Sequence, residues 1–145
     1  MEPVRVKLLR EGAALPAYGS PEAAGADLYA CLDAPVEIAP GATVMIPTGI
    51  ALEVPVHCAG LVYARSGLAC KRGLAPANKV GVIDSDYRGE VFVALYNHGS
   101  QVQTVAHGER IAQLVITPVL QPAYEPVKEL SETVRATGGF GSTGK

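Results

Sequence analysis

The chain has 145 residues, of which 48% are hydrophobic and 18% charged, so it holds enough apolar material for one packed core. This composition excludes a disordered chain. The formal net charge of -2 excludes a broad electrostatic attraction for nucleic acid or for an anionic membrane, so any anion must be bound locally.

The first predicted element is a half-buried strand over residues 4–8, where Val4, Val6 and Leu8 alternate with Arg5 and Lys7. Because charged residues interrupt the apolar ones here, this segment does not resemble a signal peptide. No run along the chain is long and apolar enough to span a bilayer. We therefore expect a cytoplasmic protein with no membrane partner.

Further short apolar or β-branched runs, each bounded by Gly, Pro or Asn, predict strands at residues 36–38, 43–54, 61–64, 91–96 and 111–119. The 16 Gly and 11 Pro residues are spread along the chain and leave no room for a long helix. The best helix candidate is residues 66–71, with Ser66 as its N-cap and Gly73 at its end. We expect an all-β fold, a jelly-roll-like barrel or sandwich of short strands with one short helix.

Another segment, ARSGLACKRG, places Arg65 and Ser66 just before that possible helix start. A guanidinium, a hydroxyl and free backbone amides could converge on a phosphate at this point. A capped helix start explains the same residues equally well.

Two carboxylates, Asp84 and Asp86, occur in the run GVIDSDYRGEV from Gly81 to Val91, which begins and ends as an apolar strand. In extended backbone they would project to the same face, which allows a metal clamp or a general base with a neighbour. An exposed turn is a third explanation.

The apolar runs stop after Pro118, and the chain ends in the Gly-rich run RATGGFGSTGK. We expect a β-barrel domain over residues 1–120 and an extended C-terminal arm over residues 121–145. A frayed tail is the simpler interpretation of such an end. However, Phe140 has no core to bury it there, and glycine amides with one cation can wrap an oxyanion. A lid over a nucleotide is therefore the alternative.

The cysteines and histidines give little sign of a metal site. Cys31, Cys58 and Cys70 are an odd, unclustered set, which predicts reduced, buried thiols. His57 beside Cys58 is the only adjacent pair, and zinc would need a second pair nearby. No role is assigned to the three histidines, His57, His98 and His107.

Five segments, in this order and over most of the chain, resemble the motifs of the homotrimeric dUTPase family. They are AGADLYA at 24–30, ARSGLA at 64–69, GVIDSDYRGEV at 81–91, GERIAQLVI at 108–116 and RATGGFGSTG at 135–144. There are two small departures, Ala64 where many members have Pro or Gly and Ala136 where Gly is frequent. Neither touches a reacting group.

The resemblance implies a dUTP diphosphatase, in which a water attacks the α-phosphorus of dUTP to give dUMP and pyrophosphate. Such an enzyme keeps uracil out of DNA and supplies dUMP for thymidylate synthesis. Asp84 matches the general base that orients and deprotonates the water, and Asp27 matches a supporting carboxylate. Mg²⁺ is the implied cofactor, held by the substrate phosphates and water and not directly by the chain.

The resemblance also implies the substrate contacts. Uracil matches a hairpin that reads both edges of the ring, made of Asn78, Gly81, Val82 and Ile83. Tyr87 matches a ring that packs on deoxyribose. The phosphates match Arg65, Ser66, Gly67 and Gln113, under a lid made of Arg135, Phe140, Gly141, Ser142 and Thr143. Each implied site draws on three chains, so the expected assembly is a homotrimer.

Two alternatives stay open. A dCTP deaminase-like relative would share the fold and an Arg-Ser element, but it needs a different catalytic carboxylate and cytosine recognition. A catalytically silent nucleotide-binding trimer would use the same fold without a base. The complete fifth motif and the intact Asp84 favour the dUTPase.

Overall fold

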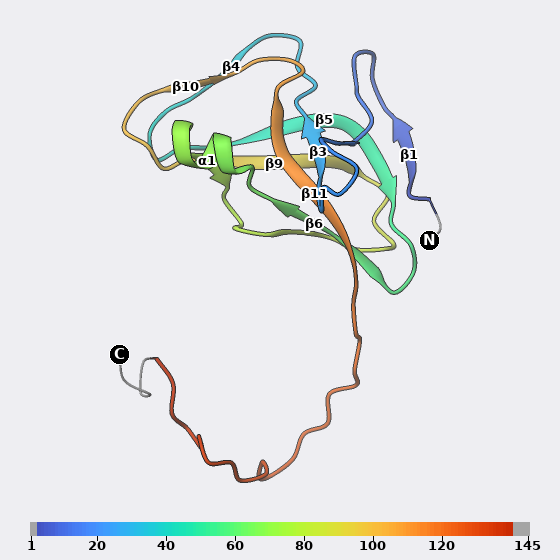
Figure 1. The fold of residues 1–145 in the computed structure, drawn as a ribbon, viewed down its shortest axis with the longest axis vertical. Helices are drawn as coiled ribbons and strands as arrows, with labels where there is room; N and C mark the ends of the chain where they lie inside the picture. The colour runs from blue at the N-terminus through green and yellow to red at the C-terminus, as the bar shows by residue number, and fades with distance from the viewer. Residues whose placement is uncertain (1–2, 141–145) are drawn as a thin grey trace.

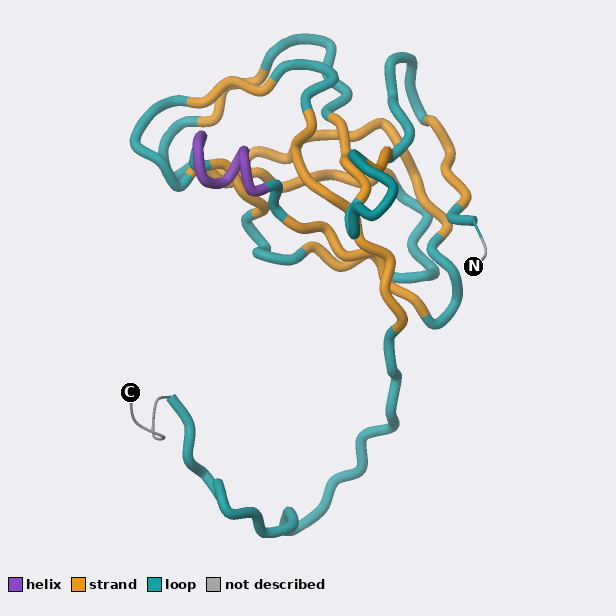
Figure 2. Tube along the Cα trace, viewed as in Figure 1, coloured by secondary structure: helices purple, strands orange, loops and turns teal. Residues whose placement is uncertain are grey.

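The short apolar runs of the chain form strands joined by Gly- and Pro-containing turns in a computed structural model, which describes residues 3–140 (Figure 1, Figure 2). The elements are β1 (Arg5–Leu8), β2 (Ala17–Tyr18), β3 (Ala26–Tyr29), β4 (Val36–Ile38), β5 (Thr43–Glu53), β6 (Cys58–Tyr63), α1 (Ser66–Arg72), β7 (Leu74–Pro76), β8 (Gly81–Ile83), β9 (Glu90–Asn97), β10 (Gln103–Val105) and β11 (Arg110–Pro118). The expected all-β class with one short helix is confirmed.

The strands pair in three antiparallel sheets, with the orders β1-β5-β9-β7, β10-β4 and β2-β3-β11-β6-β8. Neighbours in these sheets are often distant in sequence, which is the topology of a β-sandwich of the jelly-roll type. The β5 and β9 strands pair from Thr43 with Tyr96 to Pro47 with Phe92, and the register then shifts before Ala51. The resulting bulge in β5 contains Gly49, which has a φ of +70°.

The core lies between the four-stranded and five-stranded sheets, because inward-facing side chains of both sheets belong to one cluster. On β9 the period-two pattern is plain: Val91, Val93 and Leu95 are buried, whereas Phe92 is exposed. The buried polar residue Asn97 donates hydrogen bonds to Ile38 O and Gln101 O and accepts one from Gly99 N. This side chain ties the end of β9 to β4 and to the turn before β10.

Two local predictions need correction. The predicted N-cap, Ser66, is instead the first residue of α1, and the boundary residue Arg65 makes no side-chain cap hydrogen bond. The other end is as predicted, because Gly73 has a φ of 67° and its N–H bonds back to the helix carbonyls. The strand predicted at 4–8 was expected to bury its apolar face, but Leu8 on that face is 52% exposed.

Beyond β11 the chain runs away from the sheets as an arm without helix or strand over residues 119–140 (Figure 1). Its apolar side chains, including Leu120, Tyr124 and Leu130, are largely exposed. Within residues 3–140, no helix is long and apolar enough to cross a membrane.

The thiols and imidazoles only partly follow the predictions. All three cysteines are free, but Cys31 is buried while Cys70 is exposed, so the expectation of buried thiols was wrong for Cys70. Leu68 is the buried residue of α1, and Cys70, two positions further along the helix, lies on a different face. The His107 Nδ1 accepts a hydrogen bond from Leu32 N at 3.1 Å, a structural role in a loop.

Candidate functional site

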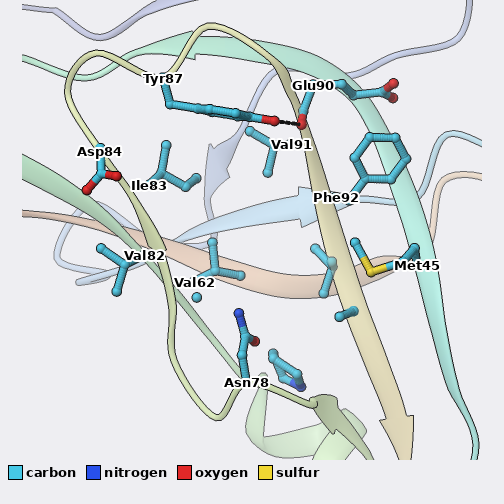
Figure 3. Close-up of a pocket in the computed structure, with 14 residues that line it drawn as sticks. Met45, Val62, Asn78, Val82, Ile83, Asp84, Tyr87, Glu90, Val91 and Phe92 are labelled. Carbon is cyan, nitrogen blue, oxygen red and sulfur yellow. Dashed lines mark hydrogen bonds between the residues drawn. The ribbon is translucent and has the colours of Figure 1, made fainter.

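A cavity of about 260 Å³ is lined by β8, by the turn that follows it and by β9 (Figure 3). Its walls include the apolar residues Val62 and Val91, with a few polar side chains around them. An apolar hollow with a small number of placed polar groups is the usual form of a small-molecule site. The structure brings together here all six residues predicted for uracil, deoxyribose and the reacting water: Asn78, Gly81, Val82, Ile83, Asp84 and Tyr87.

Asp84 stands at the start of the turn between β8 and β9, and its side chain is exposed. The turn is closed by a hydrogen bond of 3.2 Å from Tyr87 N to Asp84 O. Asp84 and Asp86 therefore lie in a turn and not in extended backbone. No cluster of three His, Cys, Asp or Glu residues that could hold a metal occurs within residues 3–140.

The ring of Tyr87 forms one wall of the cavity (Figure 3). Its hydroxyl donates to Glu90 O at 2.9 Å, so the ring folds back along its own turn. A Cβ on Gly89 would lie 2.4 Å from that hydroxyl, so only glycine leaves room for this ring position. The guanidinium of Arg88 braces the same turn by donating to Ser85 O and Tyr87 O, at 2.7 and 3.0 Å.

The other end of the cavity is the tight turn between β7 and β8. Lys79 N donates to Pro76 O, Val80 N donates to Asn78 O, and Lys79 itself has a φ of 66°. The side-chain nitrogen of Asn78 lies over Gly81, where an added Cβ would be 3.2 Å from it. This turn presents Asn78 and the backbone of β8 to the cavity (Figure 3).

A second polar group lies around Asp27 on β3. The Nε of Arg65 donates to Asp27 Oδ1 at 2.7 Å, and an Nη of Arg110 lies 3.4 Å from Asp27 Oδ2. Gln113 stands beside Asp27 in the register of β11 and β3, and its side chain donates to Ala64 O at 2.8 Å. Two guanidiniums share one carboxylate, which leaves a local excess of positive charge suited to an anion.

Ser66 and Gly67 begin α1 directly after Arg65, and both are exposed. A Cβ on Gly67 would meet nothing within 4 Å, so the space beside its backbone is open. Of the phosphate residues predicted from the sequence, Arg65, Ser66 and Gly67 thus lie at the start of α1, and Gln113 on β11 is tied to the adjacent Ala64 by its hydrogen bond.

The arm residues lie apart from the cavity and from the polar group around Asp27. Arg135 donates to Gly138 O within the arm, and Phe140 is fully exposed with a φ of 51°. The predicted lid residues Gly141, Ser142 and Thr143 lie outside the described residues.

Within one chain the cavity and the polar group around Asp27 do not form one site, because none of Arg65, Ser66 and Gln113 lines the cavity. Strand β6 lies between them. On one edge it pairs with β8, and on the other it pairs with β11, where Tyr63 lies opposite Gln113.

Two residues near these groups were not predicted from the sequence. Arg110 precedes the apolar run of β11 and resembles an ordinary strand-edge charge until its register places it near Asp27. Glu90 follows the turn of Asp84, and its carboxylate binds Gly49 N and Arg10. Neither contact has a local signal in the sequence, since each depends on strand pairing.

The family model described as dUTPase matches residues 11–144. The deoxyuridine 5'-triphosphate nucleotidohydrolase of Syntrophotalea carbinolica is 52% identical over 141 residues, which cover 97% of this chain and 96% of that protein. The protein of the same name from Desulfotalea psychrophila is 54% identical over 134 residues, covering 92% and 89%.

Solved structures agree with this match. The dUTPase of Staphylococcus bacteriophage 80alpha with dUPNHPP has a TM-score of 0.91 and 28% identity, covering 100% of both chains. A mutant dUTPase from phage phi11 of S. aureus, described with a structural Mg(II) ion, has a TM-score of 0.80 and 25% identity over 88% of this chain and 98% of the phage chain. The chain belongs to the dUTPase family.

Proposed function

We propose that this protein hydrolyses dUTP to dUMP and pyrophosphate, and so keeps uracil out of DNA while supplying dUMP for thymidylate synthesis. The observation that carries the proposal is the cavity that gathers Asn78, Tyr87 and Asp84, in a chain 52% identical to a named dUTP nucleotidohydrolase. The cytoplasm, where DNA precursors are made, is the proposed place of action.

Asp84 is the proposed general base. It accepts a proton from a water whose oxygen bonds to the α-phosphorus, while the bond from that phosphorus to the bridging oxygen breaks and pyrophosphate leaves. A carboxylate is a weak base, but a loose phosphoryl-transfer transition state depends mainly on alignment and charge neutralisation. The exposure of Asp84 at the cavity rim supports this role, because water and phosphate can both reach it.

The cavity is the proposed nucleoside site. Asn78 and the backbone of Gly81, Val82 and Ile83 read the two edges of uracil, and cytosine would leave buried partners unmatched. Tyr87 packs on deoxyribose and leaves no room for a 2′-hydroxyl. The close fit of the Tyr87 ring over Gly89 supports a fixed wall on that side.

The phosphates are the proposed ligands of Arg65, Ser66, Gly67 and Gln113, with Asp27 as the support of Arg65. The excess positive charge around Asp27 supports this assignment. Residues 121–145 are proposed as a separate arm from the domain of residues 1–120. Its end closes the site as a lid, in which Phe140 stacks on the base and the γ-phosphate is held by Arg135, Gly141, Ser142 and Thr143.

Mg²⁺ is the proposed cofactor, bound by the three phosphates and by water. The side chains fit an ion held in this way, because the groups around Asp27 are guanidiniums and an amide instead of a carboxylate cage. When bound, the ion neutralises phosphate charge. The chain's own contribution is to align the triphosphate and the water.

A homotrimer is the proposed assembly, because the cavity and the phosphate group of one chain are separate and would have to be joined by a neighbour. Two surfaces support contacts between copies. The arm exposes Leu120, Tyr124 and Leu130, and an apolar groove of about 890 Å³ opens between β1, β2 and β11.

The test is pyrophosphate release from dUTP with Mg²⁺, for the wild type, Asp84→Asn and the matched variant Asp86→Asn from the same turn. We expect release by the wild type and by Asp86→Asn, and a loss of about two orders of magnitude or more for Asp84→Asn, as for other general bases. Equal rates for the two variants would remove Asp84 from its role.

The alternatives have their own readouts in the same assay. Ammonia released from dCTP, with no turnover of dUTP, would indicate a deaminase. Binding of dUTP without any turnover would indicate a silent sensor. Light scattering that shows an active monomer would exclude the trimer.

A further inference from the structure

The nucleoside cavity ends against Glu90, a residue that no motif-based assignment gives a role. Glu90 lines the cavity and its side chain is only 15% exposed. Figure 3 shows the Tyr87 hydroxyl pointing to the Glu90 carbonyl, with the Glu90 side chain directed away from the ring. The backbone carbonyl and the side-chain carboxylate of Glu90 therefore face different partners.

The carboxylate of Glu90 is held by two donors. Oε1 accepts a hydrogen bond of 2.9 Å from Gly49 N, and Oε2 accepts one of 2.7 Å from the guanidinium of Arg10. Hydrogen bonds to an ionised acceptor are the stronger kind, and two of them fix both the position and the rotation of the group. The contact with Arg10 adds opposite charge to the geometry.

The donor Gly49 is itself fixed in place. It sits in the bulge of β5, and an added Cβ would lie 2.8 Å from Ala13 Cβ and 2.9 Å from Cys31 Sγ. Its carbonyl accepts a hydrogen bond from Leu9 N at 2.8 Å. Glu90 is thus attached to a tightly packed part of the core, and not to a loop that could follow its movements.

The backbone carbonyl of Glu90 connects this fixed carboxylate to the cavity wall. It accepts the Tyr87 hydroxyl at 2.9 Å, and the ring of Tyr87 is the cavity wall on that side. Because Tyr87 as a residue is 45% exposed, packing alone holds its ring weakly. The hydrogen bond to an anchored carbonyl is the contact that sets how close the ring comes to a bound sugar.

We propose that Glu90 is a positioning residue that sets sugar selectivity. Its anchored carboxylate fixes the carbonyl that holds Tyr87, and the fixed ring excludes a 2′-hydroxyl. This inference rests on the proposed function, since it assigns the cavity to a deoxyribonucleoside. Glu90 touches neither the substrate nor the reacting water, so its effect is exerted through Tyr87.

The experiment compares kcat/KM for dUTP with kcat/KM for UTP, in the full-length wild type and in Glu90→Ala, Glu90→Gln and Tyr87→Phe. We expect Glu90→Ala to lower the ratio of dUTP to UTP by about fivefold or more, the effect of losing about one hydrogen bond. Glu90→Gln keeps an acceptor for Gly49 N and should restore most of the ratio. The double variant with Tyr87→Phe should lose little beyond Glu90→Ala, because both changes break one linkage.

Two controls separate positioning from general destabilisation. Ile46→Val removes one buried methyl group from β5 and should lower Tm without a change in the ratio. Arg5→Gln breaks the exposed pair with Glu53 and should change neither quantity. A Glu90→Ala protein with an unchanged ratio, whatever its Tm, would overturn the inference.

Failure of the proposed function looks different from failure of this inference. In the first case the wild type releases no pyrophosphate from dUTP. In the second case the wild type is active and prefers dUTP over UTP, but none of the Glu90 variants changes that preference.

Discussion

The side chain of Gln113 lies directly over the backbone of Gly25, so close that a Cβ on Gly25 would come within 2.6 Å of the Gln113 amide oxygen and 3.1 Å of its Cβ. This contact crosses from the loop before β3 to the centre of β11. It explains why a residue without a side chain stands beside a proposed phosphate ligand.

Gly25→Ala should displace Gln113 and break its hydrogen bond to Ala64 O. We expect a loss of about 1–3 kcal/mol in the free energy of unfolding, typical of overpacking, together with a raised KM for dUTP. Urea denaturation and steady-state kinetics measure the two effects. The matched control is Gly19→Ala, where an added Cβ meets nothing within 4 Å. If both variants behave like the wild type, Gln113 moves aside without consequence.

Asp27→Asn should leave the guanidiniums of Arg65 and Arg110 without their shared carboxylate. We expect a stability loss of about 1–2 kcal/mol, since the pair is only partly buried, and a fall of about tenfold in kcat/KM for dUTP as Arg65 loses its orientation. Thermal unfolding and pyrophosphate release provide the measurements. Glu53→Gln, which breaks a more exposed pair, is the comparison and should retain activity. Unchanged kinetics in Asp27→Asn would show that Arg65 is held by other contacts.

Asn97→Ala tests the buried polar contact at the end of β9. It would leave two carbonyls and one N–H without their side-chain partner, and we expect a cost of about 1–3 kcal/mol in the free energy of unfolding. The kcat of the folded protein should stay near the wild-type value, because Asn97 lines neither the cavity nor the polar group around Asp27. Thr48→Val, which removes a single buried hydrogen bond to Val91 O, should cost less. A larger loss for Thr48→Val would reverse this ranking of the two side chains.

Removal of residues 135–145 tests the arm as a lid. No hydrogen bond among the described residues joins residues 121–140 to the sheets, so the free energy of unfolding should change by less than about 0.5 kcal/mol. We expect kcat/KM for dUTP to fall by about a hundredfold, as for the loss of other preorganised donors to a phosphate. The control is Lys128→Ala, in the arm before the lid segment. Full activity of the shortened chain would exclude a lid.

The longer strands could be predicted because their periodicity is local. β4 has the predicted bounds, and β5, β9 and β11 match within a few residues, since each carries enough alternating or β-branched residues to be recognised. β2, β7 and β10 have two or three residues each, too few for a period, and they form only where a partner strand is already in place. β3 is not among the predicted strands. Its sequence ADLY nevertheless places the apolar Ala26 and Leu28 on one face of a strand, a period-two signal that the sequence does contain.

The candidate site was predictable as two groups of residues but not as an arrangement. The carboxylate of Asp84, the ring of Tyr87 and the turn at Asn78 are close in sequence, so the single stretch of residues 78–91 contains all the residues predicted for the cavity. Arg110 and Glu90 acquire their contacts only through pairing with distant strands. Ser66 was misjudged as a cap because its hydroxyl suits either a cap or a ligand, and the backbone boundary alone decides between them.

Strand β6 separates the cavity from the phosphate group, so each chain of the proposed homotrimer would offer two half-sites to different neighbours. In a ring of three such chains, a defect in one half and a defect in the other can complement each other. Asp84→Asn and Arg65→Met proteins, each inactive alone, would on mixing and reassembly form rings with one intact junction. Recovery of about a third of the wild-type activity in mixed rings follows from that geometry, whereas sites built within single chains would recover none.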